Sequence, residues 1–83
     1  MKITVRLFGV LAERARTDSI EVEVDEGAMV RDAVDDAART PGLREPLDRL
    51  SYVIAVNREH AHMDMWLHEG DEVALIPPGG GAA

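Results

Sequence analysis

The chain has no cysteine among its 83 residues, and its aromatic side chains are one Trp, one Tyr and one Phe. Without cysteine it has no disulfide, no thiolate metal site and no thiol nucleophile. No apolar run approaches the roughly 20 residues that cross a bilayer, and the N-terminal residues lack the apolar segment of a signal peptide. A chain of this size buries one modest hydrophobic core. These absences predict a single cytoplasmic domain that does not enter a membrane.

Positive charge is also scarce. Nine Lys and Arg stand against sixteen Asp and Glu, which gives a formal net charge of −7. No basic cluster interrupts the acidic background, so a phosphate backbone would be repelled and a nucleic-acid partner is not expected. The same charge suits docking to a basic protein surface, although solubility alone is the simpler explanation.

Hydropathy patterns predict the order of the secondary structure. Alternating or continuous apolar residues predict strands at Lys2–Phe8, Ser19–Val24, Tyr52–Asn57, His60–Met63 and Val73–Ile76. A helical period predicts one main helix over Met29–Arg39, although Met29 offers no capping oxygen at its start. The run Tyr52–Asn57 is apolar enough for a central strand covered on both faces. We expect an α+β fold, a ubiquitin-like β-grasp with a mixed sheet of four to five strands, its first and last strands paired centrally, and one main helix across it.

Histidines and paired carboxylates are the candidate catalytic or metal-binding residues. His60 and His62 share a face in a strand, but two imidazoles without a firm third ligand make a poor zinc site. Asp35 and Asp36 fit an exposed helix face better than an acid–base pair. The glycines at 79–81 are not followed by the Lys-Ser/Thr and helix of a phosphate-binding loop. We therefore expect no metal, no bound cofactor and no catalysis by the chain alone.

The C-terminal residues read "PPGGGAA" and follow directly on the apolar stretch "EVALI". Pro77 and Pro78 favour an extended, polyproline-like exit, and Gly79–Gly81 make a backbone thin enough for a narrow tunnel. Glycine-rich termini are also commonly disordered. The anchored base and the stiff prolines favour a tail that places its terminal carboxylate in a partner's active site. We predict a folded domain over 1–78 and a flexible tail over 79–83.

Three segments of the chain resemble the MoaD/ThiS sulfur carriers, and most closely the small subunits of molybdopterin synthase. They are "VRLFGVLAERAR", "AVN" at Ala55–Asn57, and "L-x-x-GDEVALIPP" over Leu67–Pro78. The similarity extends over nearly the whole chain. The resemblance implies that an E1-like adenylyltransferase uses ATP to activate the C-terminal carboxylate, which then becomes a thiocarboxylate. It implies that the large synthase subunit receives the tail and that sulfur passes to the pterin precursor of the molybdenum cofactor. The chain would be a non-catalytic, sulfur-donating subunit.

The resemblance also implies roles for particular residues. Gly81, next to Gly80, would carry the thiocarboxylate. The tail residues expected to enter a partner's active site are Pro77, Pro78, Gly79, Gly80 and Gly81. The sheet face around Phe8, Leu67 and Ile76 is expected to dock both partners, with core packing as the alternative for all three and at least as good an explanation of Leu67. Trp66 stands where a proline is common, either exposed at an interface or partly buried.

The end of the chain departs from the family pattern, in which a terminal Gly-Gly carries the carboxylate. Here Gly80–Gly81 is followed by Ala82 and Ala83. A protease that removes the two alanines, partners that accept alanine, or a paralogue that binds without carrying sulfur would each account for this difference. The alternative functions are a carrier for thiamine or another thio-product, as in ThiS or CysO, and a non-carrier β-grasp interaction module.

Overall fold

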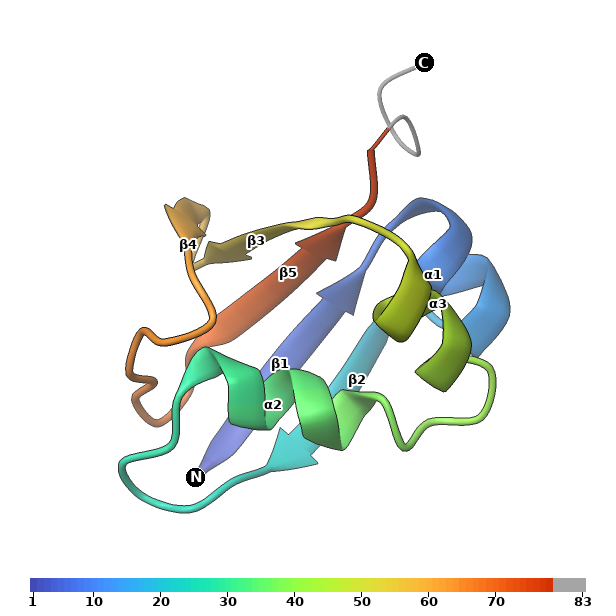
Figure 1. Ribbon diagram of the computed structural model, residues 1–83. Helices are drawn as coiled ribbons and strands as arrows, with labels where there is room; N and C mark the ends of the chain where they lie inside the picture. Colours follow the sequence, from blue (N-terminus) through green and yellow to red (C-terminus); the bar gives the residue numbers. More distant parts are fainter. Residues whose placement is uncertain (79–83) are drawn as a thin grey trace.

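The structure, a computed structural model, describes residues 1–78, and these form five strands and three helices (Figure 1). In chain order they are β1 (Lys2–Leu7), α1 (Gly9–Ala15), β2 (Ser19–Glu23), α2 (Val30–Ala37), α3 (Arg44–Arg49), β3 (Val53–Val56), β4 (Glu59–Ala61) and β5 (Glu72–Ile76). The tail predicted over 79–83, with its glycines and two alanines, lies outside the described residues. Within residues 1–78, no helix is long and apolar enough to cross a membrane.

The strands form one mixed sheet in the order β2-β1-β5-β3-β4. The first and last strands pair in parallel at its centre, with Val5 opposite Val73 and Leu7 opposite Leu75. The other neighbours pair antiparallel. With α2 lying across one face (Figure 1), this is the α+β ubiquitin-like β-grasp fold that the sequence predicts.

The hydrophobic core lies between the sheet and its helices. Period-two alternation turns Ile3, Val5 and Leu7 of β1 toward the helices, each at most 1% exposed. The helix α2 supplies the facing residues Val30, Ala33, Val34 and Ala37. No polar or charged residue of the described chain is buried. Because all three helices cover one face, the opposite face of the sheet stays open.

The open face corrects one prediction, that the third strand is covered on both sides. Ile54 is 7% exposed, but Val53 is 46% exposed, because no helix formed by residues 1–78 lies on its side of the sheet. The helix α2 also differs slightly from the prediction, since it begins one residue after Met29 and ends at Ala37. The missing cap is compensated in part by Asp32, whose carboxylate accepts a hydrogen bond of 2.8 Å from the Met29 N–H.

Candidate functional site: the C-terminal exit and its sheet face

The C-terminal exit begins at the end of the central strand β5. Leu75 is paired with Leu7 of β1, and Ile76 is paired with Val53 of β3, so the strand is held on both sides up to Leu75 and by β3 at its last residue. Pro77 is buried and Pro78 is exposed. The structure therefore gives the described part of the predicted tail a fixed base, while Gly79, Gly80 and Gly81 lie outside the described residues.

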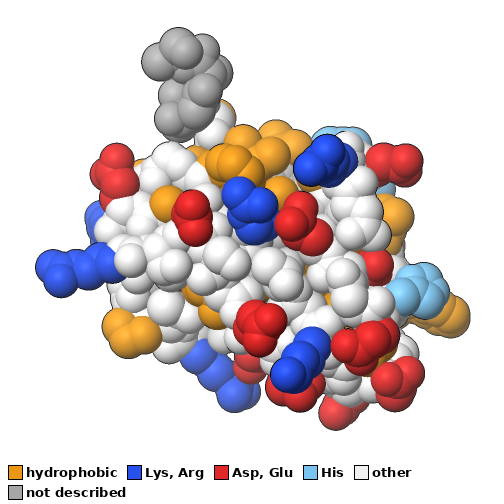
Figure 2. Space-filling model, turned by 180° about the vertical axis from the view of Figure 1, so that it is seen from behind, with side chains coloured by type: hydrophobic (Ala, Val, Ile, Leu, Met, Phe, Trp, Pro, Cys, Tyr) orange, Lys and Arg blue, Asp and Glu red, His pale blue; other side chains and the backbone are white. Residues whose placement is uncertain are grey.

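An apolar surface lies beside this exit on the open face of the sheet. It is made of Phe8, Val53, Ala55, Ala74 and Ile76, which we call the exit patch. Val53 lies opposite Ile76 and Ala55 lies opposite Ala74 in the β3–β5 ladder. Figure 2, which views the molecule from behind, shows hydrophobic side chains gathered near the C-terminal end of the described chain. The structure thus brings together two of the three predicted docking residues, Phe8 and Ile76.

The third predicted docking residue, Leu67, does not belong to this surface. Its side chain is 3% exposed and packs in the core on the helix side, and its N–H donates a 2.9 Å hydrogen bond to the Ala28 carbonyl. The prediction that Leu67 lies on the docking face is therefore wrong, and the alternative of core packing is correct. The neighbouring Trp66 is 68% exposed, so it is not the partly buried residue that was the other possibility.

One basic residue, Arg6, lies within the exit patch and was not identified from the sequence. It is opposite Ala74 in the β1–β5 ladder, and its guanidinium carbon lies 5.8 Å from the centroid of the Phe8 ring. An Arg6 Nη1 and an oxygen of Glu72 are 3.6 Å apart, an ion pair between two partly exposed side chains. Val53 was also missed. Pairing the predicted strands in register would have found it, because Val53 then falls beside Ile76.

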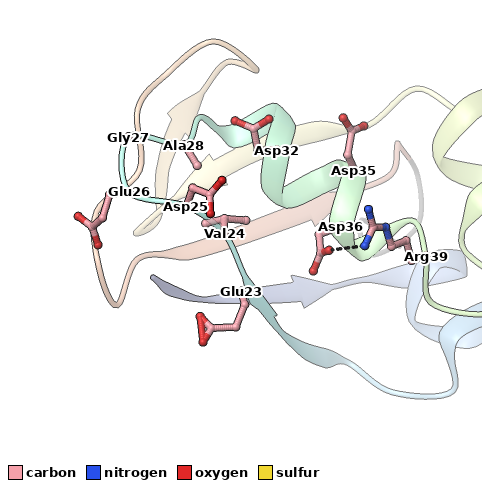
Figure 3. A pocket seen from close by; sticks show the side chains of 10 residues that line it. All are labelled: Glu23, Val24, Asp25, Glu26, Gly27, Ala28, Asp32, Asp35, Asp36 and Arg39. Atoms are coloured by element: carbon pink, nitrogen blue, oxygen red, sulfur yellow. Dashed lines mark ion pairs between the residues drawn. The ribbon is translucent and has the colours of Figure 1, made fainter.

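An acidic hollow lies elsewhere, between the end of β2 and the helix α2 (Figure 3). Its charged lining residues are Glu23, Asp25, Glu26, Asp32, Asp35, Asp36 and Arg39. Figure 3 shows the carboxylates pointing in different directions, and Asp36 forms an ion pair of 3.6 Å with Arg39. Within residues 1–78 no group of three or more His, Cys, Asp or Glu side chains is placed to hold a metal ion. The hollow is a solvated acidic surface rather than a centre of chemistry.

Tyr52, which is half-buried against the core, is an ionisable group with a perturbed pKa. Burial raises its pKa above the ordinary value of 10.0, and the nearby carboxylates of Asp35 and Asp48 raise it further. A tyrosine held neutral between two helices and the sheet has the environment of a packed residue rather than of a catalytic base. The residues left as candidates for a functional role are therefore those of the C-terminal exit and of the exit patch.

Fold and site together define a ubiquitin-like β-grasp protein whose central C-terminal strand leads out of the sheet beside an apolar patch. The chain belongs to the ThiS family, whose sequence profile matches residues 5–81. It is 38% identical over 79 residues to the molybdopterin synthase sulfur carrier subunit of Mycobacterium tuberculosis, and the match covers 93% of each chain.

Solved structures of the same fold extend this comparison. SAMP1 of Haloferax volcanii is similar with a TM-score of 0.84 and 29% identity, over 98% of this chain and 99% of that chain. A protein–protein complex of subunits 1 and 2 of molybdopterin-converting factor from Helicobacter pylori contains a chain with a TM-score of 0.69 and 23% identity, over 94% of this chain and 95% of that chain. At that identity the second likeness shows the fold alone.

Proposed function

We propose that this protein is the sulfur carrier subunit of a molybdopterin synthase. The observation that carries the proposal is the 38% identity, across 93% of both chains, to a relative of that name. The structure supports it through the anchored exit at Pro77 and Pro78 and the apolar patch beside it. In this proposal the C-terminus of the chain is the substrate of its partner enzymes, and those enzymes supply the catalytic groups.

The proposed reaction takes place at the carboxylate of Gly81. An E1-like adenylyltransferase uses ATP, the carboxylate oxygen attacks the α-phosphate, and pyrophosphate leaves. The resulting acyl-adenylate is a mixed anhydride, so a sulfur nucleophile attacks its carbonyl carbon and AMP leaves. Hydrosulfide as the nucleophile gives the thiocarboxylate directly, whereas a protein persulfide gives an acyl disulfide, which a thiol reduces to the thiocarboxylate while it forms a disulfide with the donor sulfur. The large synthase subunit uses the thiocarboxylate to deliver sulfur to the pterin precursor.

Docking would be the contribution of the described residues to this cycle. The exit patch lies on the sheet face next to Pro77, so a partner that covers the patch also surrounds the point where the tail leaves. The same patch must meet the adenylyltransferase and the large subunit in turn. Alternate docking requires each complex to dissociate, so we expect moderate affinity for both partners.

The two alanines after Gly81 require a processing step in this proposal. A protease removes Ala82 and Ala83 and exposes the Gly81 carboxylate. The shortened tail then reaches from Pro78 over three glycines, and each extended residue spans about 3.3–3.6 Å. The partner's active site must therefore lie close to the docked exit patch.

The mass of the intact protein tests the proposal. The full chain and a chain that ends at Gly81 are each incubated with ATP, a sulfur source and the E1-like enzyme of the same organism. The chain ending at Gly81 is expected to gain the mass difference between sulfur and oxygen, and the full chain is not. If neither form gains sulfur while the enzyme activates another carrier, the proposed function is wrong. Gain by the full chain alone would show that alanine carries the sulfur.

A second candidate function is favoured by the likeness to SAMP1, a small archaeal modifier protein, over almost the full length of both chains. In it the activated C-terminus is joined to another protein instead of donating sulfur. Denaturing electrophoresis of host extracts separates the two functions. Covalent adducts that disappear when residues 79–83 are deleted indicate a modifier, and thiocarboxylate without adducts indicates the carrier.

A further inference from the structure

The charged residue in the exit patch has unused hydrogen-bonding capacity. Arg6, Ala74 and Ala55 lie side by side on β1, β5 and β3. Because the two alanine side chains are short, the sheet surface beside the guanidinium is low. The Arg6 Nε is buried and has no hydrogen-bond acceptor among the described residues. The contact with Glu72, at 3.6 Å, is longer than a charge-assisted hydrogen bond of about 2.7–2.9 Å. An arginine side chain can donate five hydrogen bonds, so the described part of the protein offers this one few acceptors.

If a partner covers the exit patch, the lack of a protein acceptor for Arg6 becomes energetically unfavourable. The Arg6 and Glu72 side chains are 41% and 38% exposed, so water now solvates both charges. A docked partner removes that water, and a desolvated guanidinium destabilises the complex unless it gains a good acceptor. A carboxylate that binds the guanidinium through two parallel hydrogen bonds supplies one, and the long contact to Glu72 does not.

We propose that Arg6 is the charged anchor of the exit patch and binds a carboxylate of the large synthase subunit, in exchange for its own Glu72. This inference rests on the proposed function. Most of the chain's surface charge is negative, with a net charge of −7, so the partner surface around the patch is expected to be largely basic. One acidic side chain in that basic surface would match the one arginine of the patch. It would fix the orientation in which the tail is delivered, because only one docked position pairs the two charges.

Two substitutions separate this role from a structural one. If a partner carboxylate takes the guanidinium, Arg6→Gln weakens binding about tenfold or more, and Arg6→Lys also weakens it because an ammonium cannot bind in the two-bond geometry. Glu72→Gln, by contrast, is expected to tighten binding severalfold, since the competing internal carboxylate is gone. If Arg6 merely holds Phe8 in place through its pairing with Glu72, Glu72→Gln weakens binding in the same direction as Arg6→Gln.

The measurement is titration calorimetry of the full chain against the purified large subunit at two salt concentrations. The matched control is Arg39→Gln, because Arg39 and Asp36 also form an ion pair of 3.6 Å but lie on the helix side. The control is expected to bind like the wild type, and Arg6→Gln is expected to lose part of the salt dependence. Thermal unfolding of each variant checks that the fold is retained, and Arg6→Lys serves if Arg6→Gln does not fold.

The outcomes distinguish the two levels of the proposal. If the wild type itself does not bind the large subunit, the proposed function fails. If the wild type binds and Arg6→Gln binds equally well, or if Glu72→Gln weakens binding, the proposed function stands and the role of Arg6 is overturned.

Discussion

Two neighbouring residues of β3 have opposite environments, one exposed to solvent and one buried, so substitutions at them should have different effects. Val53 is 46% exposed in the exit patch, whereas Ile54 is 7% exposed in the core. Val53→Thr keeps the shape of the side chain and its preference for a strand, so we expect the free energy of unfolding to change by less than about 1 kcal/mol. Binding to the large subunit should weaken because the patch loses apolar surface.

The contrasting variant is Ile54→Thr, which places a hydroxyl in the core without a partner. It should lower the free energy of unfolding by about 1–3 kcal/mol. Urea unfolding measures both variants, and calorimetry measures docking. A Val53→Thr variant that docks like the wild type would contradict the assignment of Val53 to the interface.

Tyr52 gives a prediction about alkaline pH. Its pKa is raised by burial and then by Asp35 and Asp48, so the folded state favours the neutral phenol. The stability it contributes is fully present below the unfolded pKa of about 10 and is lost as the pH rises through the folded pKa. Because this is the one tyrosine of the chain, its phenolate absorbance can be followed directly.

We expect that absorbance to rise at higher pH in the folded protein than in urea. Tyr52→Phe should remove the corresponding part of the alkaline loss of stability. Asp48→Asn should lower the pKa toward its ordinary value while leaving the contribution of burial. A folded-state titration that coincides with the unfolded one would show that Tyr52 is not held in this environment.

At the scale of the element, the connection between α2 and α3 depends on Gly42. Its φ is +95°, and a Cβ at this position would collide with the backbone carbonyl oxygen of Arg14 in α1. Gly42→Ala should therefore combine the cost of a left-handed backbone with a clash that only backbone movement relieves. We expect a loss of unfolding free energy of more than about 2 kcal/mol.

The matched control for that loss is Gly70→Ala. Gly70 has a similar φ of +84°, but a Cβ there would meet nothing within 4 Å. The control should lower the free energy of unfolding by only about 1–2 kcal/mol, because its sole unfavourable term is the left-handed backbone conformation. Equal losses in the two variants, measured by urea unfolding, would show that the approach of α1 to this connection does not constrain the fold.

Elements with a clear period could be predicted from the sequence, and short or continuous ones could not. Period-two alternation places β1 correctly because its polar residues face solvent on the open side. The run "VIAV" of β3 has no polar residue to mark the open face, so the sequence favours burial on both sides. The helix α3 was not predicted, since its six residues include Pro46 and its helical period is too short to read.

The candidate site was predicted in part for the same reason. Phe8 directly follows β1 with an extended backbone and continues its alternation, and Ile76 follows the alternation of β5. The side of Leu67 is set by a single bridge between Met29 and Trp66, a long-range pairing that no local pattern encodes. Arg6 looks like one of several solvated charges until the register places it opposite Ala74.

For the whole molecule, we predict that folding and function separate at Pro78. The sheet and helices described over residues 1–78 form a continuous hydrophobic core, so we expect deletion of residues 79–83 to leave the thermal unfolding temperature unchanged. The same deletion should abolish sulfur transfer, because the activated carboxylate is lost. The measurements are calorimetric unfolding and molybdoenzyme activity in a host that lacks its own copy. Full activity after the deletion would instead favour a non-carrier interaction module.

The parallel pairing of β1 with β5 has a mechanical consequence. The chain enters the sheet at one end of β1 and leaves it at the opposite end of β5 (Figure 1). A pull on the C-terminus against the N-terminus is therefore directed along the two central strands, and it stretches all the hydrogen bonds between them together instead of breaking them one after another. β3 holds the other side of β5 in the same way. If a partner pulls on the C-terminus, as the proposed function allows, the force acts as shear on these hydrogen bonds, and the domain is expected to resist unfolding.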